Sequence, residues 1–204
     1  MAFDALSNRD VPVSDAVLAR LFTEARTHNG WSDRPVSEDL IRKLYDLTKF
    51  GPTAVNMTPA RFVFVTSPEA KVRLSAHMAE GNRAKTLAAP VNLIIAQDID
   101  FHDTLPKLFP HAPGVRDWFL DEAGRREAAF RNASLQGGYL TIAARALGLD
   151  VGPMSGFDPA GVKAEFFPDG NVEPNFIMNL GYGTDENLFP RSPRLDFEEA
   201  AQIL

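Results

Sequence analysis

Apolar side chains recur at helical spacing in two stretches near the start of the chain. Residues 14–27 show the pattern behind Ser14, a residue type favoured at helix N-caps, and the helix is expected to end near Gly30. A second helix is predicted from the cap Ser37 to the Gly-Pro pair at 51–52, which combines a C-terminal glycine with a helix breaker. Shorter helical patterns lie over residues 68–78, 159–166 and 197–204.

The strongest helical signal covers residues 122–147. Its predicted apolar stripe consists of Ala129, Leu135, Tyr139, Ile142, Ala143 and Ala146. Within this helix Gly137 and Gly138 cost about 1–2 kcal/mol of helix propensity relative to two alanines. A packed neighbouring helix or a ligand against the backbone would offset that cost, and a dimer interface would suit.

Runs of β-branched, aromatic and other apolar residues predict strands over 61–66, 91–96 and 175–183, with a short strand leading into the segment 152–157. Residues 101–118 mix prolines and a glycine with large apolar side chains, a pattern typical of a lid or wall built from short helical turns. Helices and strands alternate without an internal repeat. Their spacing alone predicts an α+β or α/β domain.

Composition narrows the class of protein. A chain of 204 residues with 45% hydrophobic content predicts one domain over residues 1–204. The net charge of −6 argues against binding to nucleic acid or to an anionic membrane, because both need a basic surface. Since no cysteine is present, disulfides, thiolate metal sites and cysteine nucleophiles are excluded. No signal peptide or membrane span is predicted, so the expected location is the cytoplasm.

The common signatures of self-sufficient catalytic sites are missing. The sequence contains no GxGxxG after a strand, no phosphate-binding Walker loop, no HExxH and no GxSxG. The four histidines, His28, His77, His102 and His111, lack metal-ligand spacing, so no metal site is predicted. A cofactor that brings its own reactivity would fit this absence.

Residues 26–29 form the first of five polar segments at the edges of regular elements. Arg26 beside the hydroxyl of Thr27 and the amide of Asn29 suits a phosphate with a hydroxylated chain, because a guanidinium presents fork-shaped donors. Taken alone, a capped helix end explains this segment more often.

Each of the other four polar segments, taken alone, is weak evidence for a binding site. Residues 51–59 place two prolines around small polar residues, which suits a stiff loop beside a planar ring, and residues 80–85 place Asn82 and Lys85 on one helical face, where solvated charge is the commoner explanation. Residues 152–157 are positioned to aim backbone N–H groups at a ligand. The last segment, 190–195, holds two arginines in an acidic tail.

Taken in order, these segments resemble the nitroreductase superfamily from about Phe22 to the C-terminus. The stretches ARTHNGW, GPTAVNMTP, EGNRAKTLAAPV, KLFPHAPGVRDWF, AFRNASLQGGYL, RALGLDVGPMSGFD and NLGYG are similar to the branch of malonic semialdehyde reductases of pyrimidine breakdown. The resemblance implies an α+β fold with a mostly antiparallel sheet flanked by helices. It also implies an intertwined homodimer with two FMN sites at its interface.

The resemblance further implies which residues contact FMN. The phosphate and ribityl chain would be held by Arg26, Thr27, Asn29, Lys85 and Arg194. The ring would meet Asn82 at its edge, and from the other subunit Pro52, Thr53, Ala54 and Asn56, with Asn132 at a further polar-contact position. Flavin N5 and O4 would meet the backbone amides of Pro153, Met154, Ser155 and Gly156. Two residues depart from the family pattern, because Asn29 stands where many members have a lysine or arginine, and Ser155 where many have glutamate.

In such a protein no catalytic side chain is required, because flavin N5 transfers the hydride. The expected activity is reduction of malonic semialdehyde to 3-hydroxypropionate in uracil degradation, with NADH or NADPH as reductant. Two alternatives stay open: a broad nitroaromatic or quinone reductase, and a non-catalytic flavin-binding domain. We expect a wall of Phe109, Trp118 and Phe119 over the ring, and a carboxylate-binding cation at Arg61 or Arg131.

Overall fold

The computed structural model describes residues 10–204, so residues 1–9 of the predicted domain lie outside the described part. Its centre is a four-stranded, wholly antiparallel sheet in the order β2 (Ala60–Val65), β3 (Val91–Asp98), β5 (Val172–Gly181) and β4 (Asp150–Met154). A separate two-stranded ribbon pairs β1 (Gly30–Trp31) with β6 (Gly183–Thr184). The predicted α+β class with an antiparallel sheet is confirmed.

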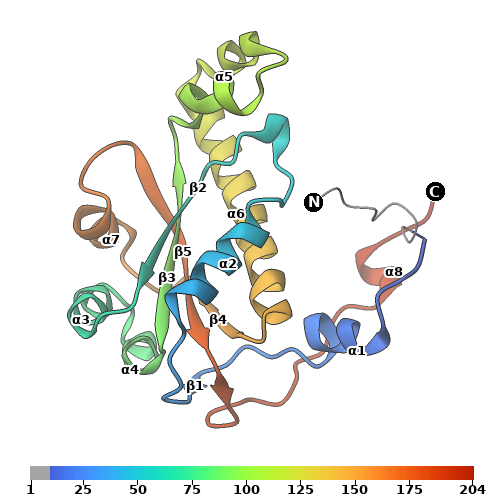
Figure 1. Cartoon of the computed structure of the whole chain (residues 1–204), viewed down its shortest axis with the longest axis vertical. Helices are drawn as coiled ribbons and strands as arrows, with labels where there is room; N and C mark the ends of the chain where they lie inside the picture. The colour runs from blue at the N-terminus through green and yellow to red at the C-terminus, as the bar shows by residue number, and fades with distance from the viewer. Residues whose placement is uncertain (1–9) are drawn as a thin grey trace.

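Helices cover both faces of the sheet (Figure 1). On one face lie α2 (Glu38–Thr48) and the long α6 (Glu122–Ala146). On the other face lie α3 (Pro68–Ala76) and α7 (Pro159–Phe166), with α4 (Glu80–Ala88) next to α3. The cap predicted at Ser37 is present, since its side chain accepts the N–H of Leu40 at 3.2 Å.

The alternation of side chains along β3 divides the core. Leu93 and Ile95 point to α2 and α6, whereas Ile94 points to α3 and α7, and all three are fully buried. Burial on both faces explains why the sequence of this strand is continuously apolar rather than alternating.

The segment after β3 is built from short helical turns, as predicted, and we call it the lid. It consists of the 3-10 turn η4 (Phe101–Thr104), the short helix α5 (Leu105–Leu108) and the 3-10 segment η5 (Pro113–Phe119). A small apolar cluster of its own, including Phe101 and Leu105, holds it together at one end of α6 (Figure 1).

Both terminal helices are shorter than predicted. The first contains α1 (Asp15–Leu18) and a π-helical turn, η2 (Ala19–Thr23), so it ends well before Gly30. The last, α8, covers only Phe197–Ala200. Neither contains a buried residue, and isolated helices of this length lack the packing that stabilises them. Their apolar faces are exposed on an arm that extends from the body of the fold (Figure 1).

The stripe predicted on α6 is only partly the buried face. Ala129 and Ala143 are buried as expected, but Leu135 and Tyr139 are 44% and 42% exposed. The buried face instead includes two polar residues, Asn132 and Gln136, which bond to backbone groups of the neighbouring loop and strand. Apolar spacing could not distinguish this mixed face from the exposed one.

The two glycines of α6 face different surroundings. A Cβ on Gly137 would come within 2.5 Å of the Phe176 ring, so this glycine allows the helix to pack closely on β5. A Cβ on Gly138 would meet nothing within 4 Å. Gly138 therefore lies on the open side of the helix, beside Leu135 and Tyr139.

Among the described residues, no helix is long and apolar enough to span a membrane.

Candidate active site

The phosphate-type residues predicted at both ends of the chain meet around one cavity of about 410 Å³. We call it the arginine cavity, because four guanidinium-bearing residues line it. Its lining consists of Phe22, Ala25, Arg26, Thr27, Asn29, Arg145, Phe189, Pro190, Arg191, Ser192 and Arg194. Among the described residues, no acidic side chain lines this cavity, although the chain as a whole carries a charge of −6.

Hydrogen bonds from arginines to backbone carbonyls hold the walls of the cavity together. Arg26 donates to the carbonyl of Phe189, and Arg191 donates to the carbonyl of Ala25 at 3.1 Å. Arg194 donates to carbonyls within its own segment, at 2.8 and 3.1 Å. The C-terminal segment is thereby fixed against residues 25–29, about 160 positions away in sequence.

The segment 26–29 is attached to the sheet by its own backbone. Thr27 forms a parallel bridge to Val151 of β4, and the N–H of His28 donates to the carbonyl of Val151 at 3.1 Å. The ring of His28 lies 3.0 Å through Nδ1 from the carbonyl of Thr184 and 3.6 Å through Nε2 from Asp150. Since strand bonds impose an extended backbone here, the predicted helix could not continue to Gly30.

Two contacts connect this segment to α4 and to the end of β4. Lys85 Nζ donates to Asn29 Oδ1 at 3.2 Å, and Asn82 Nδ2 donates to the carbonyl of Gly156 at 2.9 Å. A side chain at Gly156 would come within 2.7 Å of Asn82 Nδ2, so glycine permits this approach. The structure thus brings together the predicted residues of segments 26–29, 82–85 and 153–156, together with Arg194.

Exposed and buried residues alternate at the end of β4 and just beyond it. Met154 is 6% exposed and packs in the core, whereas Pro153 and Ser155 are exposed. The carbonyl of Gly156 also accepts the N–H of Ala79 at 3.0 Å, which fixes the turn against the start of α4.

Residues 52–58, which we call the proline loop, are backbone-strained. Val55, Asn56 and Thr58 have φ values of 45°, 52° and 36°, in the left-handed region that non-glycine residues rarely occupy. Such residues cost about 1–3 kcal/mol each and persist where surrounding contacts over-determine them. Strain of this kind is concentrated at functional sites, so the proline loop is a candidate ligand-contacting segment.

Polar side chains from α6 and from the loop itself hold the proline loop. Asn132 on α6, 6% exposed, accepts the N–H of Ala54 at 2.9 Å and donates to the carbonyl of Ala128. The hydroxyl of Thr53 accepts the N–H of Thr58 at 3.1 Å, and Asn56 Nδ2 donates to the carbonyl of Leu108 in the lid at 2.8 Å. In this chain Asn132 therefore positions the loop that was predicted to contact the ring.

Within one chain, the arginine cavity and the proline loop lie far apart. The cavity lies at the end of α6 near Ala146, whereas Asn132 and the loop lie 14 residues earlier along the helix, about 20 Å at 1.5 Å per residue. The predicted contacts therefore form two groups on one chain.

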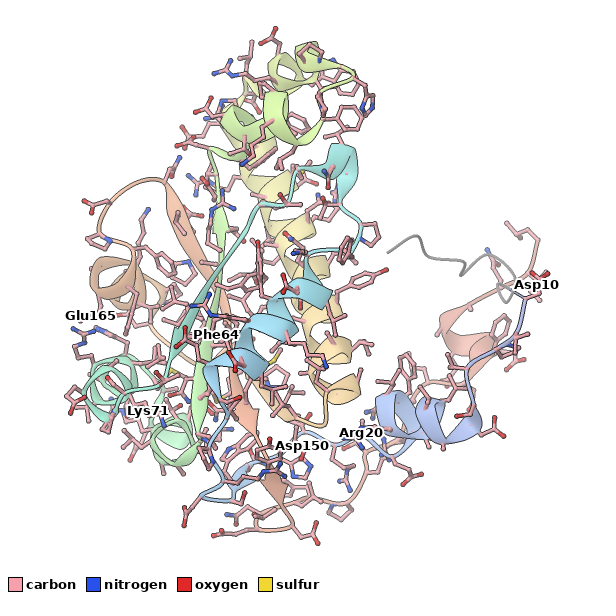
Figure 2. All side chains as sticks on the ribbon, in the orientation of Figure 1. Asp10, Arg20, Phe64, Lys71, Asp150 and Glu165 are labelled. Carbon is pink, nitrogen blue, oxygen red and sulfur yellow. The ribbon has the colours of Figure 1, made fainter. Side chains whose placement is uncertain are left out.

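Arg145, in the last turn of α6, is a cavity residue that the sequence predictions missed. Its NH1 donates to the carbonyl of Leu21 at 2.8 Å, and Arg20 Nε donates to the carbonyl of Arg145 at 2.8 Å. Figure 2 shows Arg20 close to Asp150, and both line a smaller cavity next to the first one. In the sequence, an arginine at a helix C-terminus looks like ordinary compensation of the helix dipole.

The two arginines proposed for a substrate carboxylate already have carboxylate partners. Arg61 pairs with Asp98 at 2.5 Å and also donates to the carbonyls of Thr58 and Ala60, and Arg131 pairs with Glu127 one helical turn away. Both side chains act as structural ion-pair partners in this structure.

The aromatic side chains expected to cover the ring differ in exposure. Phe119 packs edge-on against the buried Phe101, with ring centroids 5.1 Å apart, and Phe109 lies against His111 at 3.9 Å. Trp118 is 73% exposed. Of the three, Trp118 alone presents most of its surface to solvent. Over the described residues, no group of three or more potential metal-ligating side chains is present.

Comparison with known proteins places this architecture. The profile of the nitroreductase family matches residues 22–182. A protein of Caulobacter sp. strain K31, provisionally named NADH dehydrogenase/NAD(P)H nitroreductase, is 63% identical over 189 residues, which cover 93% of this chain and 97% of that protein. A Burkholderia lata protein with the same provisional name is 58% identical over 192 residues, or 94% of this chain and 98% of that protein.

Solved structures agree at the level of the fold. A nitroreductase from Exiguobacterium sibiricum, described in complex with FMN, superimposes with a TM-score of 0.83 at 18% identity, covering 91% of this chain and 96% of that one. An enone reductase of gut-bacterial fatty acid biohydrogenation gives a TM-score of 0.79 at 20% identity, covering 95% of this chain and 100% of that one. With a family profile matched across most of its length, the chain belongs to the nitroreductase family.

Proposed function

We propose that this protein is an FMN-dependent oxidoreductase that takes its electrons from NADH or NADPH. The observation that carries the proposal is the arginine cavity, a concave site with four guanidinium groups and no acidic lining residue among those described. The names of the relatives, which include NAD(P)H nitroreductase, and the FMN bound to one structural neighbour support it.

The donor set fits the phosphate end of FMN. A phosphate monoester carries about −1.5 to −2 charges at neutral pH and offers three strong acceptor oxygens. Arg26, Arg191 and Arg194 supply fork-shaped donors, while Thr27 and Asn29 supply the hydroxyl and amide suited to a ribityl chain. Like charges crowded in one cavity also need an anion for balance, and a phosphate meets that need.

From the cavity, the remaining contacts lead toward a ring site. Asn29 accepts a hydrogen bond from Lys85 on α4, and Asn82, one turn earlier on the same helix, donates to the carbonyl of Gly156. We place the flavin edge beside Asn82 and the backbone of residues 153–156, where the N–H groups of residues 154–156 would orient the ring. When bound, FMN supplies the hydride-accepting and hydride-donating chemistry at N5, so no catalytic side chain is needed.

We further propose that the protein functions as a homodimer. An apolar groove of about 480 Å³, lined by Phe22, Leu135 and Tyr139 among others, lies open on α6, and Gly138 in its lining leaves room for a close neighbour. Exposed apolar patches of this kind mark interfaces. In a dimer, the proline loop and Asn132 of one subunit would complete the ring site at the other subunit's arginine cavity.

For the physiological acceptor we propose malonic semialdehyde, reduced to 3-hydroxypropionate in uracil degradation. The similarity of seven sequence stretches to the malonic semialdehyde reductase branch supports this substrate. The reaction consumes one NAD(P)H and one proton for each aldehyde.

Quinones or nitroaromatic compounds are the second candidate acceptors, and two observations favour them. The relatives carry nitroreductase names, and both arginines considered for the substrate carboxylate are already paired with Asp98 and Glu127. An uncharged acceptor needs no such cation.

Flavin titration and acceptor kinetics test these proposals. The purified protein is expected to bind FMN, to oxidise NADH or NADPH, and to be reoxidised faster by malonic semialdehyde than by menadione. Faster reoxidation by menadione would select the second candidate. A protein that binds FMN but oxidises neither nucleotide would be a non-catalytic flavin-binding domain, which the Asn29 and Ser155 departures allow. Absence of FMN binding would refute the proposed cofactor.

A further inference from the structure

Arg145 reaches the arginine cavity from a different direction than the other cations. Arg26, Arg191 and Arg194 come from the extended segments at the two ends of the chain, whereas Arg145 comes from the last turn of α6 in the body of the fold. Its backbone is fixed by that helix and its NH1 by the carbonyl of Leu21. Arg145 is therefore the cavity cation with the firmest scaffold.

The surroundings of Arg145 leave its charge incompletely balanced. Its Nε is buried and has no hydrogen-bond partner among residues 10–204. Burial lowers the pKa of its guanidinium, the charge of Arg191 lowers it further, and Asp150 acts in the opposite direction. Asp150 lines the neighbouring cavity rather than this one. Arg145 and Arg191 repel each other beside a cavity in which no described residue is acidic, and binding of an anion between them would stabilise both.

We propose that Arg145 is a further phosphate-binding residue, and that it makes the cavity select a flavin carrying a phosphate monoester over the same flavin without one. This inference rests on the proposed FMN function and deepens it. It assigns to α6, the helix on which we propose the dimer interface, a direct part in recognising the cofactor. The phosphate would then bridge three separate parts of the chain: residues 26–29, the end of α6 and residues 191–194.

A purely structural role for Arg145 is the competing explanation. Arg145 and Arg20 form a reciprocal clasp, in which each donates to a backbone carbonyl of the other's segment. Loss of the clasp would disturb the whole cofactor site, so it would weaken the binding of any flavin. Loss of a phosphate contact would weaken only the binding of a phosphorylated flavin. The ratio of the dissociation constants for riboflavin and FMN separates the two explanations.

The test uses three variants of the full-length protein stripped of flavin. Arg145→Gln removes the charge but keeps a polar side chain, and Arg145→Lys keeps the charge. Arg20→Gln is the matched control, because it breaks the other half of the clasp and Arg20 does not line the arginine cavity. Thermal unfolding of each variant verifies that it is folded.

Fluorescence titrations with FMN and with riboflavin give the ratio for each variant. We expect Arg145→Gln to weaken FMN binding about 10- to 100-fold, the range for a charge-assisted hydrogen bond, with riboflavin binding changed less than about twofold. Arg145→Lys should keep FMN binding within about fivefold of the wild type, and Arg20→Gln should leave the ratio unchanged.

Other outcomes overturn the inference or the proposed function. An equal loss of both affinities in Arg145→Gln or, if Arg145→Gln does not fold, an equal loss of both affinities in Arg145→Lys, would assign Arg145 to the clasp alone. Wild-type protein that prefers FMN, with an unchanged ratio in Arg145→Gln, would refute this inference and leave the proposed function intact. Wild-type protein that binds neither flavin would refute the proposed function itself.

Discussion

The arginine cavity and the proline loop were predicted to contact the same cofactor, yet they are built by different physical means. The cavity is held by charged side chains that donate to carbonyls across long sequence distances, and its backbone is extended. The loop is instead characterised by its backbone conformation, with three non-glycine residues at positive φ held by Asn132 and Thr53. One region gathers positive charge, and the other presents a fixed shape.

Because the two regions differ in this way, they can lie at different points along α6 of one chain. A phosphate site needs several flexible cations that converge, whereas a surface for a planar ring needs a rigid backbone anchored to a helix. The helix α6 carries Arg145 in its last turn and Asn132 near its middle. It therefore contributes a side chain to the arginine cavity and also holds the proline loop in position. A dimer that packs along α6 would bring complementary regions of two chains together.

The largest expected effect concerns the cavity. Replacing Arg194 by alanine should weaken FMN binding about 100-fold and leave riboflavin binding unchanged, because one charge-assisted contact to the phosphate is lost. Titration of the cofactor-free protein with both flavins measures this effect. Arg42→Ala, an exposed helical arginine paired with Glu38, is the control. Unchanged FMN affinity in the Arg194 variant would disprove its phosphate assignment.

The second effect concerns the support of the loop. Asn132→Leu leaves the N–H of Ala54 without its acceptor and should lower the free energy of unfolding by about 1.5 kcal/mol. Urea denaturation measures the change, and hydrogen exchange should show faster opening of residues 53–58. Arg131→Ala, at an exposed position of the same helix whose ion pair with Glu127 is solvent-exposed, should change stability by less than about 0.5 kcal/mol. Equal losses in both variants would show that Asn132 does not anchor the loop.

The third effect separates strain from stability within the loop. Val55→Gly removes a side chain that disfavours the left-handed region but adds entropy to the unfolded chain, so the two terms nearly cancel. We expect stability to change by less than about 1 kcal/mol, while NAD(P)H oxidation slows several-fold because the loop loses rigidity. A stability loss above about 2 kcal/mol would mean that packing of Val55, rather than loop shape, dominates.

The smallest effect is a pH dependence in the lid next to the loop. A hydrogen bond from Arg116 holds the pKa of Asp103 below its ordinary value of 3.8. A carboxylate with a depressed pKa contributes stability that is present above its unfolded pKa and is lost as pH falls through the folded value. Lowering the pH from about 6 to about 3 should therefore lower the melting temperature of the wild type slightly more than that of Asp103→Asn. Thermal unfolding at several pH values measures this difference. Identical pH profiles would show that this exposed pair contributes nothing.

Periodicity and punctuation predicted most of the fold. The pattern over 159–166 matches α7, and the apolar run at 91–96 matches most of β3, because buried faces impose a regular spacing. Prediction failed at the terminal helices, whose apolar faces have no partner in the described part of the chain, and on α6, where polar Asn132 and Gln136 occupy the buried face.

The candidate site was predicted from ordered motifs rather than from geometry. That route identified Arg26, Asn29 and Arg194, which the structure brings to one cavity. It missed Arg145, because its position at a helix end has an ordinary explanation, and it missed the strain at Val55, because a β-branched residue gives no sequence signal for positive φ.

A subunit-complementation measurement tests most directly whether one site is built from two chains. One subunit would carry Arg194→Ala in the cavity and the other would carry Ala54→Phe in the proline loop, with different affinity tags to isolate the mixed dimer. If cavity and loop come from different subunits, one site of the mixed dimer keeps both regions intact. The account predicts that the mixed dimer binds one FMN with wild-type affinity, although neither variant alone does. A mixed dimer that binds FMN no better than its parents would contradict it.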